Sequence, residues 1–249
     1  MRRCTLTERC ALACHADRLY VYTVYASAHN HGTCMESVIP ARGAVLDRLA
    51  RLCQSGHWRR SPLAAAPSGF AQLDASLPGG GWPLGAIAEL MPVTSGIGEL
   101  AVLLPALSRL ARAGRYIAWI APPYLPHAPA LVQRGVPLER VLIIRSCTLQ
   151  ESLWAAEQAL LCPAFGAVLS WPARISDKHV RRLQLAAETG GSLGILYRPA
   201  AAASEPSPAA LRLRLEPTAD GLAVAILKCR GGRAGLRLQL PQAALPARA

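Results

Sequence analysis

The chain has 249 residues, of which 52% are hydrophobic, and it carries a formal net charge of +12. A hydrophobic fraction of this size supports a packed core and excludes an intrinsically disordered chain. No stretch reaches the roughly 18 consecutive apolar residues of a membrane span, and the N-terminus lacks the apolar segment of a secretory signal, so we expect a cytoplasmic protein without membrane contact.

Positive charge is concentrated at the two ends of the chain. Residues 1–65 and 174–249 contain more basic than acidic side chains, whereas residues 66–173 contain equal numbers of both. Basic surfaces attract anionic partners such as nucleic acid. The alternative is a solvated surface that is simply rich in arginine.

The first 42 residues show no sustained periodicity and are predicted to form an irregular or disordered leader. Five of the eight cysteines lie in the first 53 residues, but no pair has the CxxC spacing of a zinc site, so we expect no metal. Residues 43–67 are predicted to form an amphipathic helix, over 43–53, and a linker. Between these two lies a basic aromatic tip that is a candidate partner contact: Trp58, Arg59 and Arg60.

Residues 68–242 alternate short apolar runs with amphipathic segments, and the tail at 243–249 is expected to be loose. Strands are predicted at 86–91, 116–121, 141–145, 166–171 and 193–197, with helices between them at 99–113, 127–134, 148–161 and 179–189. This alternation predicts an α/β fold with a parallel sheet flanked by helices on both faces. Period-two patterns then predict antiparallel C-terminal edge strands at 211–215, 222–227 and 236–240.

The turn after the strand at 86–91 has the plan of a phosphate-binding loop without its chemistry. Such a loop needs glycines, a Lys that reaches the phosphates and a Ser or Thr that binds Mg²⁺. Gly96 is present, but Ile97 occupies the position of the Lys and Gly98 that of the hydroxyl residue. Glu99 follows at the predicted helix start, where its charge would repel a triphosphate.

Short motifs in the same order along most of residues 57–240 resemble the ImuA family, which is related to RecA and SulA. They include 77–83 (LPGGGWP), 96–100 (GIGEL), 119–123 (WIAPP), 154–160 (WAAEQAL), 181–187 (RRLQLAA), 207–213 (SPAALRL) and 227–231 (LKCRG). The resemblance implies a RecA-like P-loop NTPase core and an accessory role in SOS-induced translesion DNA synthesis. The implied partners are an ImuB-like homologue of Y-family polymerases and an error-prone polymerase subunit, with RecA as a further candidate.

The resemblance also indicates that the ATP site is degenerate. RecA-like enzymes place a Mg²⁺-binding carboxylate at the end of the strand that corresponds to 165–169, and Ser170 stands there instead. Phosphoryl transfer depends on positioning and charge neutralisation, so a chain that lacks the Lys, the hydroxyl and the carboxylate is expected to have no catalytic residues and no cofactor.

Three further hypotheses remain open. The first is direct binding of single-stranded DNA through basic side chains at Arg181, Arg182, Arg198, Lys228, Arg230 and Arg233. The loop at 199–208 holds no basic residue, so Arg198 at its border is its candidate phosphate contact. The second, less favoured, is division inhibition through FtsZ, as the kinship with SulA implies, and the third is an ATPase with a rearranged site.

Overall fold

The computed structural model describes residues 20–26, 33–36, 51, 65–146, 148–172 and 174–241. The candidate tip at Trp58, Arg59 and Arg60, the predicted helix at 43–53 and the tail at 243–249 therefore lie outside the described residues, apart from residue 51.

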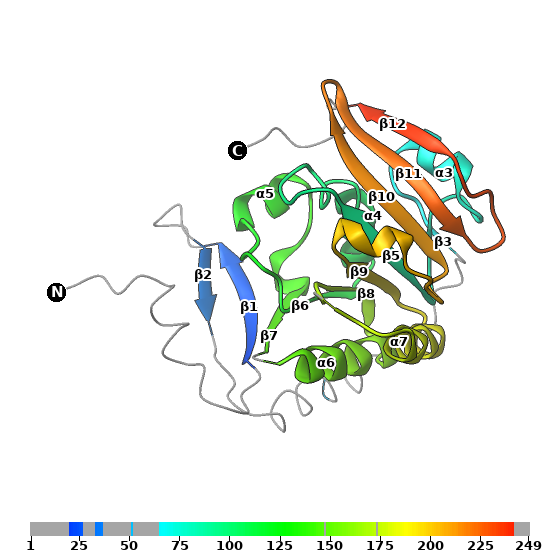
Figure 1. Cartoon of the computed structure of the whole chain (residues 1–249). Helices are drawn as coiled ribbons and strands as arrows, with labels where there is room; N and C mark the ends of the chain where they lie inside the picture. Colours follow the sequence, from blue (N-terminus) through cyan, green and yellow to red (C-terminus); the bar gives the residue numbers. More distant parts are fainter. Residues whose placement is uncertain are drawn as a thin grey trace.

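Ten of the strands in the described part of the chain form one central sheet (Figure 1), in the order β12-β11-β10-β5-β9-β8-β6-β7-β1-β2. Two short strands, β3 (Ala65–Ala66) and β4 (Trp82–Pro83), pair separately. The strands of the central sheet are β1 (Tyr20–Ala26), β2 (Thr33–Glu36), β5 (Ala86–Pro92), β6 (Tyr116–Ile120), β7 (Val141–Arg145), β8 (Phe165–Ser170), β9 (Leu193–Tyr197), β10 (Leu211–Thr218), β11 (Gly221–Cys229) and β12 (Arg237–Pro241).

The interior of the sheet is parallel and its edges are antiparallel. The five predicted strands from β5 to β9 are confirmed and pair in parallel, as their continuous apolar sequences require. The first of the predicted edge strands, β10, differs from the prediction because it joins β5 in parallel and is antiparallel only to β11. Strands β11 and β12 form the expected antiparallel edge.

The opposite edge departs from the irregular leader expected for residues 1–42. Strand β1 pairs antiparallel with β7, and β2 pairs with β1, so residues 20–26 and 33–36 extend the central sheet. The sequence does not reveal this pairing because the partner strand lies more than a hundred residues away.

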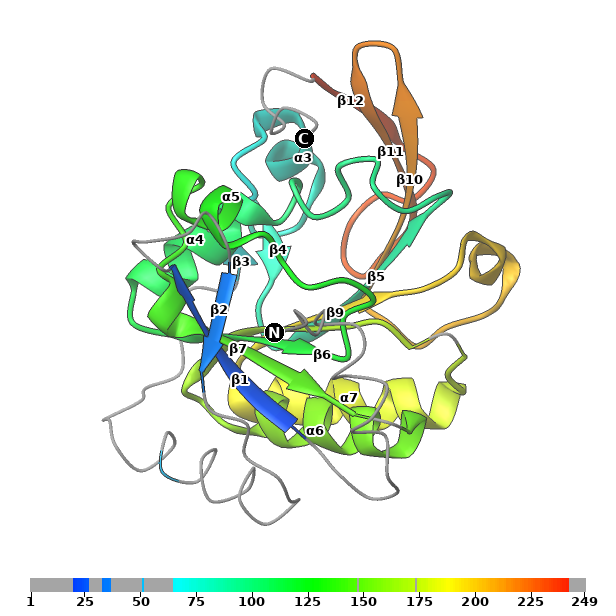
Figure 2. The same cartoon turned by 90° about the vertical axis from the view of Figure 1, so that its left-hand side faces the viewer.

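Helices cover both faces of the sheet, as predicted (Figure 2). Helices α4 (Leu104–Arg112) and α5 (Ala128–Gln133) lie on one face with α3 (Ala71–Ser76), and α6 (Leu149–Leu161) and α7 (Asp177–Gly190) lie on the other. Alternate strand residues feed the two hydrophobic cores: Ala88 and Leu90 of β5 belong to the first core, and Ile87 belongs to the second. This alternation is the period of two that a strand buried on both faces requires.

Helix α4 begins later than predicted. Residues 99–103 form successive turns, with the Ala101 amide donating to the Gly98 carbonyl, and the helix starts at Leu104. Gly96 and Gly98 have φ angles of 81° and 96°, in the left-handed region, so the chain between them cannot join a right-handed helix.

Among the described residues, no helix combines the length and apolar character needed to cross a bilayer.

Candidate functional site

The loop after β5 binds its own carboxylate where a phosphate loop would bind an anion. The Gly96 amide, in the left-handed conformation, donates a hydrogen bond to Oε1 of Glu99 at 3.0 Å. Backbone N–H groups at such a turn are the groups that hold phosphate in nucleotide-binding proteins. Glu99 therefore competes for this donor with any phosphate that approaches the loop.

Ile97 is part of the hydrophobic core. Its side chain is 6% exposed and packs in the same cluster as Leu103 and Leu107. The side chain at the Lys position is thus directed into the protein and stabilises the loop by apolar burial.

Aromatic side chains occupy the carboxyl end of the sheet next to this loop. Trp171, directly after β8, stacks on Tyr197 at the end of β9 with ring centroids 4.9 Å apart, and it also contacts Trp119 of β6 at 5.7 Å. The Tyr197 hydroxyl donates to the Glu99 carbonyl at 3.3 Å. In open α/β sheets a ligand usually binds at the carboxyl ends of the strands, and here three aromatic rings lie at that end.

Two further groups at this edge bear on its chemistry. Burial, together with the nearby charge of Glu99, raises the pKa of Tyr197 well above 10, so its phenol stays neutral at physiological pH. Ser170, at the strand end where a carboxylate was sought, is buried, and its hydroxyl has no hydrogen-bond partner in the described part of the chain. In the same part of the chain, no group of His, Cys, Asp and Glu side chains could hold a metal ion.

Arg198 lies inside the protein and does not form a surface contact. Its guanidinium is bound to the fully buried carboxylate of Glu89, at 3.2 Å, and to Glu205, at 2.7 Å. Arg212 completes the network, with Nε 2.7 Å from the second oxygen of Glu89, and Ser207 donates to Glu89 at 2.8 Å. The role expected for Arg198 in phosphate binding is therefore corrected: this network fixes the segment 199–210 to β5.

The other predicted basic residues lie on α7, on β11 and in the turn after β11. Arg181 is exposed and has no ion-pair partner within the described residues, while Arg182 pairs with Glu157 on α6. Lys228 donates to the Ser207 carbonyl at 2.6 Å, and Arg230 lies 3.8 Å from Glu188. Arg233 is exposed in the β11–β12 turn. Lys228 and Arg230 thus both donate to the segment 207–208, whereas Arg182 is paired across to α6.

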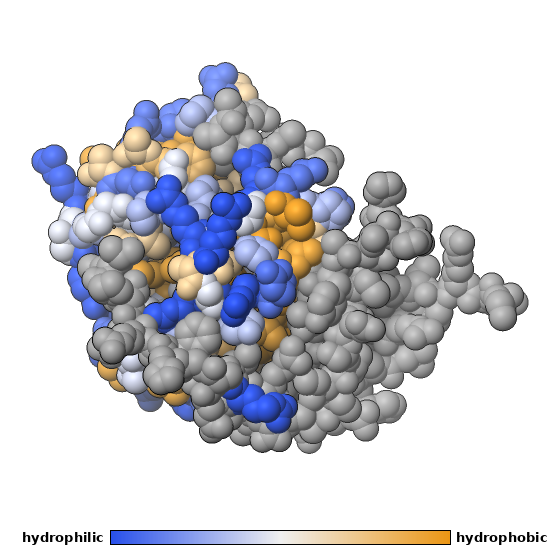
Figure 3. Space-filling model, turned by 180° about the vertical axis from the view of Figure 1, so that it is seen from behind, coloured by the Kyte–Doolittle hydropathy of each residue, from blue (hydrophilic) through white to orange (hydrophobic). Residues whose placement is uncertain are grey.

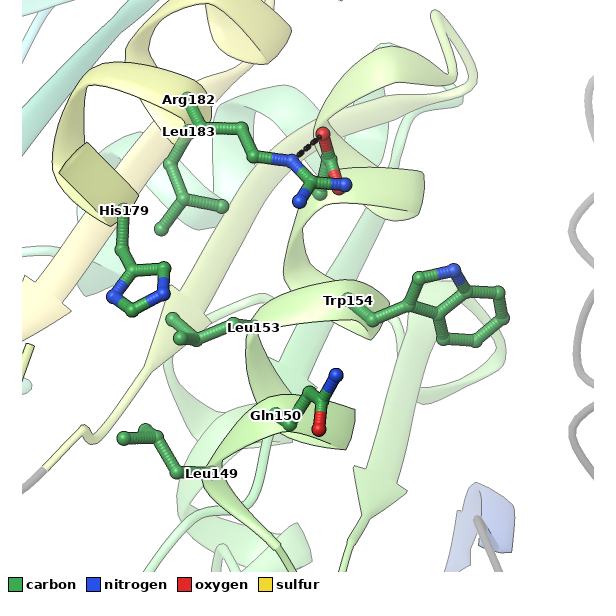
Figure 4. Close-up of a pocket in the computed structure, with 8 residues that line it drawn as sticks. Leu149, Gln150, Leu153, Trp154, His179, Arg182 and Leu183 are labelled. Atoms are coloured by element: carbon green, nitrogen blue, oxygen red, sulfur yellow. Dashed lines mark hydrogen bonds and ion pairs between the residues drawn. The ribbon is translucent and has the colours of Figure 1, made fainter.

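A groove runs between α6 and α7 (Figure 4). Its volume is about 510 Å³, and Leu153 and Leu183 lie between the helices while Arg182 bridges to Glu157 above them. Thr148 and Glu151 form a reciprocal capping box that fixes the start of α6. Three leucines on the outer surfaces of these helices are partly exposed: Leu149, Leu161 and Leu185.

A second cavity lies between α4 and α5, where the sequence patterns predict no site. Its lining includes Arg109, Arg112 and Arg134, which lie in the segment 66–173 whose charges balance overall. A count over a long segment hides such a cluster because the acidic residues lie elsewhere in space.

The middle of the chain is similar to known proteins. Residues 85–194 match the family model of the cell division inhibitor SulA. SulA of Photorhabdus laumondii is 31% identical over 111 residues, which are 45% of this chain and 63% of the relative. SulA of Yersinia pestis (strain Pestoides F) is 32% identical over 98 residues, which are 39% of this chain and 58% of the relative.

The chain thus spans less than two thirds of the length of these curated relatives. The matched segment contains the loop after β5, the groove and the arginine-lined cavity. Strands β10 to β12 and the buried partners of Glu89 lie beyond it.

Proposed function

We propose that the protein is a non-catalytic accessory protein of the SOS response that acts by binding other proteins. The observation that carries this proposal is the state of the loop at the carboxyl end of β5. There the Gly96 amide is bound to Glu99, Ile97 is buried in the core, and the Tyr197 hydroxyl is bound to the Glu99 carbonyl. Phosphoryl transfer is almost wholly electrostatic positioning, and this site lacks the Lys, the hydroxyl at position 98 and the strand-end carboxylate that supply it, while the Gly96 amide is already bound to Glu99.

A RecA-like core is the scaffold in this proposal. Support comes from β5, the strand that precedes the loop, which lies inside the sheet with β9 on one side and β10 on the other. With no nucleotide to bind, such a core keeps one conformation and presents fixed surfaces to its partners.

The finer proposal is an adaptor in translesion DNA synthesis, with an ImuB-like polymerase homologue and an error-prone polymerase subunit as partners. It rests on the resemblance to ImuA, whose motifs continue past the SulA match. Ser207 and Arg212, from the motif at 207–213, both bind Glu89 of β5, so this motif is integral to the core.

Inhibition of cell division is the second candidate. It is favoured by the match to SulA over residues 85–194, which includes the groove between α6 and α7. Binding of single-stranded DNA has less support, because Arg198 is buried and Arg182, Lys228 and Arg230 already contact groups of the protein.

Co-purification separates these candidates. Tagged full-length protein is mixed with an ImuB-like protein or with FtsZ, each with and without ATP. We expect ATP-independent capture of the ImuB-like protein, whereas capture of FtsZ alone would favour the second candidate. Failure to capture either protein would overturn the adaptor proposal.

A matched pair of variants then locates the contact. Leu149→Glu changes an exposed residue that lines the groove, and Leu227→Glu makes the same change at a similarly exposed position on β11. Loss of capture in the first variant alone would place the partner on the groove.

A further inference from the structure

Three arginines from two helices line one cavity on the face covered by α4 and α5. Arg109 and Arg112 lie in the last turn of α4, and Arg134 follows the last residue of α5. The cavity has a volume of about 510 Å³, and its walls also include Leu104, Pro105 and Val132. Figure 3, seen from behind, shows hydrophilic and hydrophobic side chains side by side across this side of the molecule.

These cations have no counter-ion within the described residues. No carboxylate lines the cavity, and none of the seven ion pairs formed by described residues includes Arg109, Arg112 or Arg134. The dipole of α4 favours positive charge at its last turn, which accounts in part for Arg109 and Arg112. Arg134 is the C-terminal cap residue of the short helix α5, whose dipole favours positive charge there in the same way, and the end of this helix brings it to the same cavity.

One of the arginines is held in place before any ligand arrives. Nε of Arg112 donates to the Gly135 carbonyl at 3.0 Å, and the Ser108 hydroxyl donates to the same oxygen at 2.7 Å. The φ of 73° at Gly135 favours glycine, and a Cβ at this position would lie 2.2 Å from Nη2 of Arg112, so that the guanidinium would have to move. The turn therefore fixes Arg112 by its Nε, and no hydrogen bond or ion pair to described residues engages its two terminal nitrogens.

We propose that this cavity binds an acidic segment of a partner protein, with carboxylates on the arginines and an apolar side chain against Pro105 and Val132. Guanidinium groups recognise carboxylates through paired N–H donors, and an arginine that is already positioned loses little entropy on binding. Val132 is 51% exposed, so its apolar surface is available to a ligand.

The lining favours a peptide over a nucleic acid. Single-stranded nucleic acids are bound by basic grooves that also present aromatic side chains on which bases stack. No aromatic side chain lines this cavity, and four of its ten lining residues are aliphatic or Pro: Ala101, Leu104, Pro105 and Val132. This inference does not depend on which of the two proposed functions holds.

Binding of defined probes to the full chain tests the proposal. The probe is a fluorescein-labelled peptide with four Asp or Glu residues around one Leu, and its counterpart carries Asn and Gln instead. A labelled dodecamer of thymidine nucleotides is the nucleic-acid arm. We expect saturable binding of the acidic peptide, loss of binding with the amide peptide, and weaker binding of the oligonucleotide.

Two double variants with the same change in net charge locate the site. Arg109→Gln with Arg134→Gln removes two cavity arginines, whereas Arg181→Gln with Arg233→Gln removes two exposed arginines elsewhere. We expect the first variant to raise the Kd at least about tenfold, since it removes two charge-assisted hydrogen bonds to the peptide, and the second to change it less than about twofold.

Three results would overturn the proposal: no saturable binding of the acidic peptide, equal weakening in both variants, or tighter binding of the oligonucleotide through the cavity arginines. Circular dichroism and thermal unfolding of both variants check that the fold is intact, and because the four residues lie at the surface we expect no change in either.

Discussion

The polar groups at the end of β5 are paired within the chain, whereas the arginines of the cavity between α4 and α5 have no counter-ion among the described residues. At the end of β5, the Gly96 amide binds Glu99, the Tyr197 hydroxyl binds the Glu99 carbonyl, and Ile97 is buried. In the cavity, Arg109 and Arg134 carry charges that no described residue neutralises. The first region is closed by contacts within the chain and the second is open to a ligand.

This difference indicates where binding is to be sought. A region whose donors and acceptors are already paired contributes to stability and offers little to a ligand, since a new contact must first break an existing one. A region with unpaired cations gains from any anion that reaches it. The part of the chain that most resembles a ligand site in sequence is therefore the less suited to bind one.

The largest expected effect lies in the buried ion network of Glu89 on β5. Glu89→Gln removes the charge that holds Arg198 and Arg212 in the interior. Loss of one partner from a buried ion network leaves uncompensated charge, so we expect the free energy of unfolding to fall by about 3–5 kcal/mol. Urea denaturation measures it.

The control for this change is Glu216→Gln, because Glu216 forms more exposed pairs with Arg214 and Arg237. Its expected cost is below about 1 kcal/mol. Equal costs for the two variants would show that the Glu89 network is no more important than a surface pair.

Ile97→Ala tests whether the loop is closed by the core. Because Ile97 is buried in the hydrophobic cluster, truncation should lower the free energy of unfolding by about 2–4 kcal/mol. Val93→Ala, at a position 38% exposed in the same loop, is the control and should have a small effect. An Ile97→Ala variant as stable as the parent would mean that the loop does not pack as described.

The buried phenol of Tyr197 leads us to expect that the free energy of unfolding falls at alkaline pH. Burial raises the pKa of Tyr197 in the folded protein above its usual value of 10, whereas in the unfolded chain it ionises near 10. The neutral phenol of Tyr197 therefore makes its full contribution to the free energy of unfolding below pH 10. Above pH 10 this contribution is lost, by up to about 1.4 kcal/mol per pH unit.

Urea denaturation between pH 9 and 11 measures this loss, and Tyr197→Phe is the matched variant because it keeps the ring and removes the proton. The parent should lose more stability than the variant over this range. Parallel curves for the two proteins would contradict the buried, neutral phenol.

The smallest expected effect lies in the open region. Gly135→Ala introduces a Cβ against Arg112 in a backbone conformation that suits glycine, and we expect a loss of about 1–2 kcal/mol. Gly114→Ala is the control, since its φ is 86° but nothing lies within 4 Å of the added Cβ. A greater loss in Gly135→Ala, measured by thermal unfolding, isolates the contact with Arg112.

The sequence predicts the interior of this fold well and its edges less well. Strands β5 to β9 are continuous apolar runs, and their order along the chain suffices to predict a parallel sheet. The pairing of β1 with β7 and the parallel pairing of β10 with β5 depend on contacts between distant segments, which periodicity does not encode. Residues 99–103 form turns ahead of α4, which the apolar pattern alone does not reveal.

The candidate site shows the same limit. The substitutions at Ile97, Gly98 and Ser170 are visible in the sequence because they fall at fixed positions of a known motif. Whether a basic residue is exposed or buried is not visible, and Arg198 and Arg109 show both errors: one was expected at the surface and is buried, and the other was overlooked and lines a cavity.

Isothermal titration of the full-length protein with Mg·ATP measures whether the loop after β5 binds a nucleotide, with a working RecA-type ATPase as the positive control. Because the groups at the end of β5 are already paired or buried, we predict no saturable heat up to about 1 mM nucleotide. Stoichiometric, Mg²⁺-dependent binding would contradict this prediction and would show that the chain holds a nucleotide.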